Sequence, residues 1–522
     1  MESKTSFFNF KMIRRDIKMH WPIWAITLAG YLLSCTTIIS LEGNHGLFSS
    51  FGSNPDFVVA YDIIEMLNGF TQLFSACLGF VVAAAAFGYL GKRRKHYFYE
   101  SLPFTKLSLF ATRFLFGICI LFIPVFSIYI IEILQSTLHG YCAIGELTQW
   151  LIISIAEYLF WYALGILVIV ISGRLAMAGF CYIAIAVVWL VFEAVLDVYA
   201  QLLYFGVHSG LGLLFNLSDK NIFSPVEFFE SIDTNYSSEE KMDLYPDGTF
   251  LKVLIALVAA ALLVVLAYVL YKRRKAEKTE DNFVFAPVKV IFSYCFAFFF
   301  SLGFTLFFTG LFISSDEGQA HIASRCIGIL VLIIICGFIG YMASCMIVEK
   351  RFKIFKENMV KCCIFLAVIS IFMIAMFHDV FRIERYVPDK NNCTEAAIAS
   401  DYTYDQISYS RRYYQKQAVD KLVEAQQMII DNMDDLVFTA RSYWDYERVS
   451  YNNISLTFVE KGKSFRRNYY VRENSKLDKM LEQFFDENRD IFKKARLRED
   501  DYGHYEYNDN TGSYDYINDP IY

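Results

Sequence analysis

Acidic residues inside long apolar runs are the first positions in this sequence that could do chemistry. They are Glu132, Glu157, Glu193 and Asp197. A carboxylate at membrane depth is costly unless it faces protein, water or a partner. Glu132 and Asp197 fall near the ends of their runs, where the side chain can reach the interface, which favours a structural role. Glu157 and Glu193 lie deeper, although Glu193 is one helical turn from Asp197. We expect an in-membrane polar site at these two, with Glu157 contacting a path through the membrane or a seam between subunits.

Side chains that build catalytic or metal sites are scattered. The eight histidines run from His20 to His504 without metal or triad spacing, and no CxxC or HxxxH pattern occurs. Most of the twelve cysteines lie in or beside apolar runs and read as small core hydrophobes; Cys393 alone falls in the large polar carboxyl-terminal region. We therefore expect no catalytic residue, no metal site and no cofactor in this chain.

Nucleotide chemistry is also missing. Gly91-Lys92 is the nearest match to a phosphate-binding loop, yet Ala86 stands where the first glycine belongs and Arg93 replaces Ser or Thr. Any ATP that this protein uses must bind to another chain.

Composition places the chain in a membrane. Its 522 residues are 56% hydrophobic and 17% aromatic, and the mean hydropathy is +0.36. No cleavable signal peptide is expected, because Lys11, Arg14, Arg15 and Lys18 precede an apolar run that is too long for one. We predict about nine spans of ~20 residues or more, at 21–41, 68–90, 109–134, 147–172, 175–199, 250–271, 288–313, 327–348 and 359–377. The tight Gly173-Arg174 turn joins the fourth and fifth.

Loop charges predict the orientation. The basic clusters 92–95, 272–275 and 350–356 all fall on the side of the amino terminus, and acidic loops such as 218–250 fall on the other. The positive-inside rule puts the basic side in the cytoplasm. The sequence thus predicts a mainly α, polytopic helical protein of the cell membrane, with its amino terminus inside and residues 378–498 outside.

The outer region, residues 378–498, should be a small α+β domain. Val419, Leu422 and Ile429 recur at helical spacing within a helix at about 412–434. Alternating residues at 454–458 and 465–471 predict a hairpin turning at Lys461-Gly462-Lys463. Ser475 and Asp478 form a capping box for a closing helix. Residues 499–522 are rich in Tyr, Asp and Asn, which predicts a disordered acidic tail.

Residues 1–20 should form an amphipathic helix in the membrane interface. Phe10, Ile13, Ile17 and Trp21 share one stripe, and Lys11, Arg15 and Lys18 lie opposite. A topology anchor and a mechanical element are equally compatible with this pattern.

The loop 91–107 carries a resemblance to a known family. It is strongly basic and ends in Ser101-Leu102-Pro103-Phe104-Thr105-Lys106, and it follows an interfacial helix and the first two spans of a six-span unit that closes at 272–275. This arrangement resembles a bacterial ABC transporter permease of the type 2, export-type class. The motifs at 453–458, 461–463 and 467–471 resemble an outer domain found on some long permeases of that class.

The resemblance implies a domain plan and partners. Residues 21–275 would be the six-span core with outer loop 200–249, and 276–377 a linker with three further spans. A helix at about Tyr97 to Leu107 would couple to a separate ABC ATPase subunit, which would bind ATP and Mg²⁺. The permease would act as a homo- or heterodimer among membrane lipids, without nucleic acid. The implied coupling residues are Phe98, Glu100, Ser101, Leu102, Pro103 and Lys106.

Three classes of function follow from these features. An exporter of an amphipathic peptide, drug or lipid-like substrate requires the basic inner face and the coupling loop, both of which the sequence contains. A membrane receptor or sensor whose outer domain binds a ligand or antimicrobial peptide is the alternative, but the sequence shows no cytoplasmic domain large enough for an output. A membrane enzyme lacks the necessary clusters.

Overall fold

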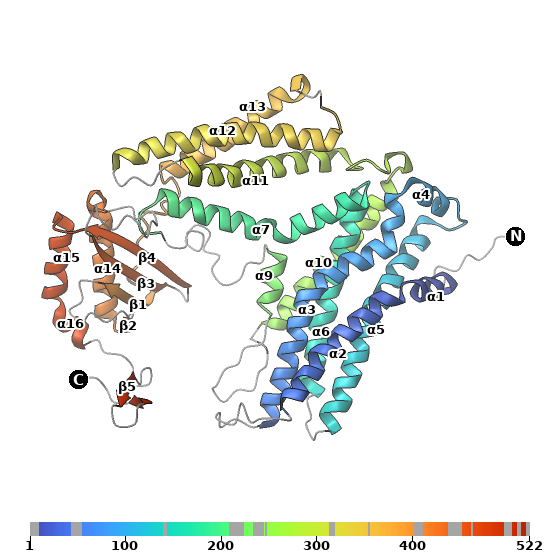
Figure 1. Cartoon of the computed structure of the whole chain (residues 1–522), viewed down its shortest axis with the longest axis horizontal. Helices are drawn as coiled ribbons and strands as arrows, with labels where there is room; N and C mark the ends of the chain where they lie inside the picture. Colours follow the sequence, from blue (N-terminus) through green and yellow to red (C-terminus); the bar gives the residue numbers. More distant parts are fainter. Residues whose placement is uncertain are drawn as a thin grey trace. The chain divides into compact units, whose positions relative to one another are not determined.

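The computed structural model of the chain is mainly helical, with a small sheet domain near the carboxyl end (Figure 1). It describes residues 10–42, 55–138, 144–207, 224–232, 245, 248–312, 319–352, 355–400, 411–436, 451–460, 463–494, 504–508 and 513–517. The chain divides into two compact units. Unit 1 comprises residues 1–190, 220–295 and 344–352, and unit 2 comprises 191–219, 296–343 and 353–522.

Eight helices in the described residues are long and apolar enough to cross a membrane, which makes this a multi-pass membrane protein. The apolar stretches are Phe74–Gly91, Lys106–Leu134, Ile144–Ile171, Leu175–Leu203, Thr249–Arg273, Ala286–Leu311, Arg325–Glu349 and Glu357–Phe377. Each coincides with one of the predicted spans. The remaining predicted span, 21–41, matches helix α2 (Trp21–Glu42), whose Trp21–Leu33 part is a shorter apolar helix. The count of nine stays a prediction.

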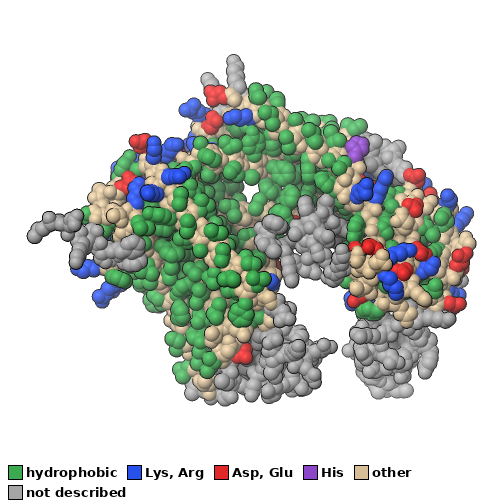
Figure 2. Space-filling model, turned by 180° about the vertical axis from the view of Figure 1, so that it is seen from behind, with side chains coloured by type: hydrophobic (Ala, Val, Ile, Leu, Met, Phe, Trp, Pro, Cys, Tyr) green, Lys and Arg blue, Asp and Glu red, His purple; other side chains and the backbone are tan. Residues whose placement is uncertain are grey.

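Unit 1 is a bundle of α2, α3 (Pro55–Phe87), α5 (Lys106–Leu138), α6 (Ile144–Ile171) and α10 (Thr249–Arg273), with α1 (Phe10–Met19) lying across it. The short helix α9 (Pro225–Glu230) also belongs to it and is capped by the Ser224 hydroxyl. Figure 2 shows apolar side chains covering the visible surface of the long helices, as lipid-facing helices require.

Small residues let α3 and α6 pack closely, along what we call the α3–α6 seam (Ser75, Gly79, Ala83, Glu157, Trp161 and Gly165). A Cβ on Gly79 would lie 2.7 Å from the Trp161 Cβ, and one on Gly165 would lie 2.8 Å from the Ala83 Cβ. Such contacts leave no space for a side chain, so these glycines set the approach of the two helices.

Unit 2 begins within α7 (Leu175–Leu203) and takes parts of α11 (Ala286–Phe312) and α12 (Gln319–Glu349) with all of α13 (Phe355–Phe377). Interhelical hydrogen bonds from hydroxyl groups link these helices. Tyr199 Oη donates to the Leu302 carbonyl at 3.1 Å, and Ser301 Oγ donates to the Ile333 carbonyl at 3.1 Å.

The carboxyl-terminal domain, for which we keep the name outer domain from the prediction, is an antiparallel sheet in the order β2-β1-β3-β4, from β1 (Cys393–Ser400), β2 (Arg411–Tyr413), β3 (Tyr451–Glu460) and β4 (Lys463–Arg472). Helices α14 (Lys416–Asp431), α15 (Lys476–Glu487) and α16 (Arg489–Lys494) complete it. Ile454, Leu456 and Phe458 of β3 point into a core shared with α14 and α15. The predicted hairpin is confirmed, and Asp478 N donates to Ser475 Oγ at 3.1 Å, as the predicted cap requires.

The structure differs from the sequence predictions at three places in the carboxyl-terminal region. The helix expected from 412 starts at Lys416, because Arg411–Tyr413 pairs with β1 instead. Strand β1 was not predicted, since three of its eight residues are Ala and only Thr394 and Ile398 are β-branched. In the tail, β5 (His504–Asn508) pairs with β6 (Ser513–Ile517), so the described part is a hairpin of alternating tyrosines and not a disordered segment. The hairpin turn at 461–462 and most of outer loop 200–249 lie outside the described residues.

The segments that follow α7 and α13 accept hydrogen bonds from the edge strand β4. Asn468 N donates to the Gly206 carbonyl at 3.0 Å, and the fully buried Arg467 guanidinium donates to the Ile383 carbonyl. Phe205 N donates to Glu384 Oε1 at 2.9 Å. Two membrane helices of unit 2 are thereby attached to one strand of the outer domain.

Candidate functional site

The chain turns at one end of the unit 1 bundle through residues 91–107, which we call the α4 corner (Figure 1). The 3-10 turn Gly88–Gly91 ends α3, α4 (Arg93–Glu100) follows, and a turn at 101–104 leads into α5. The single helix expected from Tyr97 to Leu107 is therefore wrong. Pro103 has no N–H and disfavours helical dihedrals at Leu102, so the chain breaks there. It restarts at Lys106, where Ser108 N donates to Thr105 Oγ1 at 3.1 Å.

Most of the predicted coupling residues lie on the surface of the α4 corner. Phe98 is 60% exposed, and its neighbour Tyr97, which the sequence analysis did not single out, is 48% exposed. Leu102 is half-buried; the exposed members are Phe98, Glu100, Ser101, Pro103 and Lys106. Two exposed aromatic side chains on a short helix outside the apolar stretches form an apolar patch that water does not favour.

The cations around this patch are exposed. They are Lys92, Arg93, Arg94, Lys95 and Lys106. Glu100 Oε1 lies 3.8 Å from Lys106 Nζ and so partly offsets them. The surface suits an acidic partner with an apolar recess.

The rear of α4 is fixed to the linker that follows α10. His96 is buried, and its Nδ1 lies 2.8 Å from Thr279 Oγ1, while its Nε2 lies 3.5 Å from Glu100 Oε1. Burial lowers the pKa of His96 below its usual value, against the opposing effect of Glu100. At neutral pH the imidazole is thus uncharged and can serve as a hydrogen-bond partner within the protein.

One guanidinium joins three helix ends next to this contact. Arg274 is buried, and its Nη1 donates to the carbonyls of Ile169, Val170 and Ser172 at 3.0, 2.7 and 2.9 Å. Its Nη2 donates to the Leu90 carbonyl at 2.8 Å. Burial lowers the pKa of Arg274 to about 10, so it stays charged at neutral pH. These carbonyls are the orphan acceptors at the ends of α6 and α3, and Arg274 satisfies them from the end of α10.

The linker itself pairs with the turn between α6 and α7. Gly173 N donates to the Asn282 carbonyl at 3.2 Å, Glu280 N donates to the Gly173 carbonyl at 3.0 Å, and Val284 N donates to the Ile171 carbonyl at 3.0 Å. Lys350 Nζ, just after α12, donates to the Glu280 carbonyl at 2.7 Å. Residues 274–284 thus hold the predicted Gly173-Arg174 turn, α4 and the end of α12 together.

A buried ion pair connects α1 with α5 and α4. Arg113 Nη1 lies 2.8 Å from Asp16 Oδ2, and both side chains are at most 4% exposed. The same guanidinium lies 4.7 Å from the Tyr99 ring centre and 5.6 Å from that of Tyr89. Sequence reasoning missed this pair, because 97 positions separate the two residues. The sequence offered one signal, an isolated charge on each of two otherwise apolar helix faces: Asp16 in α1 and Arg113 in α5.

Glu157 lies within the α3–α6 seam. It is buried, and Ser75 Oγ donates to its Oε1 at 2.5 Å. Nearby, Tyr31 Oη of α2 lies 2.8 Å from Thr71 Oγ1 of α3 and 3.0 Å from Tyr158 Oη of α6. The carboxyl therefore contacts protein inside unit 1, and its contact with a path through the membrane or with a seam between subunits stays a prediction.

The other three in-span carboxylates differ from one another. Glu132 is buried at 1% exposure, so the expectation that it snorkels to the interface is wrong. Glu193 and Asp197 are half-buried on the part of α7 that belongs to unit 2. The predicted pair Glu157 and Glu193 thus belongs to two different units.

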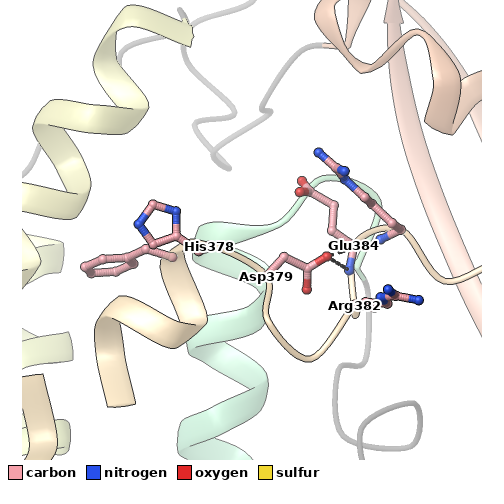
Figure 3. A pocket seen from close by; sticks show the side chains of 6 residues that line it. His378, Asp379, Arg382 and Glu384 are labelled. Atoms are coloured by element: carbon pink, nitrogen blue, oxygen red, sulfur yellow. Dashed lines mark hydrogen bonds between the residues drawn. The ribbon is translucent and has the colours of Figure 1, made fainter. Parts of the chain in front are cut away.

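A separate, open cleft of about 570 Å³ lies in unit 2 where α13 ends; it is lined by Phe377, His378, Asp379, Arg382, Glu384 and Arg385 (Figure 3). Asp379 turns the chain here, since its carboxylate accepts from Ile383 N at 2.6 Å and from Glu384 N at 3.1 Å. Burial raises the pKa of Glu384. Figure 3 shows the Arg382 and Glu384 side chains pointing in different directions, so the cleft does not converge on a ligand.

Among the described residues, no group of His, Cys, Asp and Glu could hold a metal ion. No protein-family model, curated protein or solved structure matches the chain. The geometry of the α4 corner is therefore the best guide to function.

Proposed function

We propose that this chain is the membrane-spanning permease subunit of an ATP-binding-cassette transporter, and that α4 docks on a separate ATPase subunit. One observation carries the proposal. Tyr97 and Phe98 are exposed on a short helix whose rear is fixed by the His96 to Thr279 contact. A rigid helix with an exposed aromatic pair is suited to receive force from a soluble partner, because its contacts cannot be absorbed by local bending.

The contacts behind α4 supply a route for that force. Tyr99 of α4 lies against Arg113 of α5, and Arg113 is paired with Asp16 of α1. Displacing α4 would thus act on α5 and α1 together, while Arg274 resists separation of the α3, α6 and α10 ends. ATP and Mg²⁺ would bind to the partner, which supplies hydrolysis.

Orientation and substrate are part of the same proposal. The exposed cations of the α4 corner, with Lys272, Arg273 and Lys350, favour a cytoplasmic position for this end in the plasma membrane. The amino terminus would then be cytoplasmic and the outer domain extracytoplasmic. We infer export of an amphipathic peptide, drug or lipid-like substrate by a homo- or heterodimer.

Co-purification with an ATPase subunit tests the proposal directly. The chain is expressed in its native cells, solubilised and captured, and any bound ABC ATPase subunit and its hydrolysis rate are measured. Phe98→Ala should lower ATPase retention about tenfold, as loss of an interface anchor does. The control is Tyr414→Ala, which removes a 40% exposed aromatic side chain from the outer domain and should change nothing.

Two results would contradict the assignment. One is capture of the intact chain from these cells without any ABC ATPase subunit. The other is equal ATPase retention and hydrolysis for Phe98→Ala and the wild type at matched levels of inserted protein.

A further inference from the structure

Helix α1 has a buried side that faces the bundle. Met12, Ile13 and Asp16 are buried, and Ile17 packs against the core of unit 1. The predicted apolar stripe of Phe10, Ile13, Ile17 and Trp21 is therefore divided. Its central residues contact protein, and its end residues Phe10 and Trp21 are 68% and 58% exposed.

The opposite side of α1 is basic. Lys11, Arg14, Arg15 and Lys18 are all exposed. At about 100° per residue these four positions fall within an arc of about 100°, centred almost opposite the buried side. The one acidic residue of the helix, Asp16, is buried and paired with Arg113 at 2.8 Å. Its second carboxylate oxygen lies 3.3 Å from Arg15 Nη2, so the charge of Arg15 is partly offset, whereas Lys11, Arg14 and Lys18 have no acidic neighbour on α1. The exposed surface thus has no negative charge of its own on α1.

Apolar side chains flank this basic surface. Phe10 and Trp21 lie at one border of the cationic arc, and the exposed Met19 lies at the other. Only His20 separates α1 from the apolar helix α2. A helix of this kind, joined without a linker to a membrane span, sits at the level where lipid headgroups meet acyl chains.

We propose that the exposed face of α1, formed by Lys11, Arg14, Arg15 and Lys18, is a binding surface for the headgroups of anionic phospholipids. The cations would contact the phosphates, while Phe10, Met19 and Trp21 enter the upper acyl region. Lipid phosphate accounts for both features of this face, its charge and its apolar borders. An acidic protein surface would also account for the charge, but α1 continues through His20 directly into the apolar helix α2, which favours a position at the lipid headgroups.

Binding to native lipids tests the surface on the full-length chain. The purified protein in neutral detergent is titrated with phosphatidylglycerol or phosphatidylcholine, and bound lipids are counted by native mass spectrometry. The quadruple variant K11Q/R14Q/R15Q/K18Q should bind phosphatidylglycerol at least tenfold more weakly, because each cation near an anionic surface contributes roughly a fivefold factor. Phosphatidylcholine binding should not change.

Two controls make the result specific. R412Q/R472Q/K476Q/K479Q removes four exposed cations from the outer domain and should bind phosphatidylglycerol as the wild type does. K11R/K18R keeps the charge and should retain binding.

Each other outcome overturns the proposal. Unchanged phosphatidylglycerol binding in the α1 variant would remove it. An equal loss in the outer-domain variant would show an effect of net charge alone. Unchanged lipid binding with weaker capture of an ATPase subunit would reassign the face to a protein partner. Because lipid binding is measured without ATPase, the result stands apart from the transport proposal.

Discussion

Replacing Arg274 by Met should destabilise unit 1 by about 3 kcal/mol. In the structure two nitrogens of this side chain serve four carbonyls, at distances of 2.7 to 3.0 Å. Nη1 carries two hydrogens and Nη2 supplies at least one, so about three charge-assisted bonds form, each worth about 1.5–3 kcal/mol. The free-energy cost of burying the charge opposes the gain from these hydrogen bonds. The pKa is lowered from 12.5 to about 10, which corresponds to roughly 3 kcal/mol.

The neighbouring residue provides a matched control. Arg273 belongs to the same basic cluster but is exposed, so Arg273→Met should leave stability unchanged within error. Arg274→Lys keeps the charge but cannot reach all four carbonyls, and it should fall between the two. Detergent-micelle unfolding by increasing SDS, followed by tryptophan fluorescence, suits the measurement, because five of the six tryptophans belong to unit 1.

The difference in unfolding midpoint between Arg273→Met and Arg274→Met tests the prediction. Equal unfolding midpoints for Arg273→Met and Arg274→Met would refute the reasoning that Arg274 holds the helix ends together. A larger loss of stability for Arg274→Lys than for Arg274→Met would also refute it. The expected order of the variants follows from the number of carbonyls that still receive a hydrogen bond.

Three further predictions concern the seam, the α4 corner and the topology. Gly79→Leu should abolish folded protein because α6 leaves no space for a side chain, whereas Gly69→Leu on the same helix meets nothing within 4 Å and should be tolerated, as the yield of monodisperse protein will show. The lowered pKa of His96 means that the unfolded state binds the proton more readily than the folded state, so stability is lost as pH falls through about 6.5. Amide exchange in α4, corrected for intrinsic rates, should therefore be faster at pH 5.5 than at pH 7.5. Equal protection at the two pH values would contradict this. An impermeant maleimide should label Tyr414→Cys in intact cells but Lys95→Cys only after lysis, and the reverse pattern would invert the predicted orientation.

The choice of an introduced cysteine in the topology test follows from the structure. Cys393 is the natural candidate by sequence, but its thiol is buried and burial raises its pKa to about 11. A reagent that needs an exposed thiolate would miss it on either side of the membrane.

Long apolar helices were the most predictable part of the fold. Length and hydropathy alone define a span, so the predicted spans match helices to within a few residues, apart from α3, which begins at Pro55, and α12, which begins at Gln319. The hairpin of β3 and β4 was equally accessible, since Ile454, Leu456 and Phe458 alternate with polar residues. Strand β1 was not, because its place is decided by pairing with β3 and not by its own residues.

The candidate site was only partly predictable. Sequence located the α4 corner through its basic residues and Pro103, and it marked Phe98. It did not reveal that His96 contacts Thr279, a residue 183 positions away. Contacts of this kind depend on how helices pack, which local patterns do not encode.

The pairing of residues 280–284 with the Gly173 turn also sets an order of events during biosynthesis. The turn forms when α6 and α7 insert, but Asn282, whose carbonyl accepts from Gly173 N, leaves the ribosome 109 residues after Gly173. At ~5–20 residues per second, this interval lasts roughly 5–20 s. During that time residues 274–284 do not yet hold the end of α6 and the rear of α4, so a chain that ends before residue 274 would lack the contacts that join these helix ends.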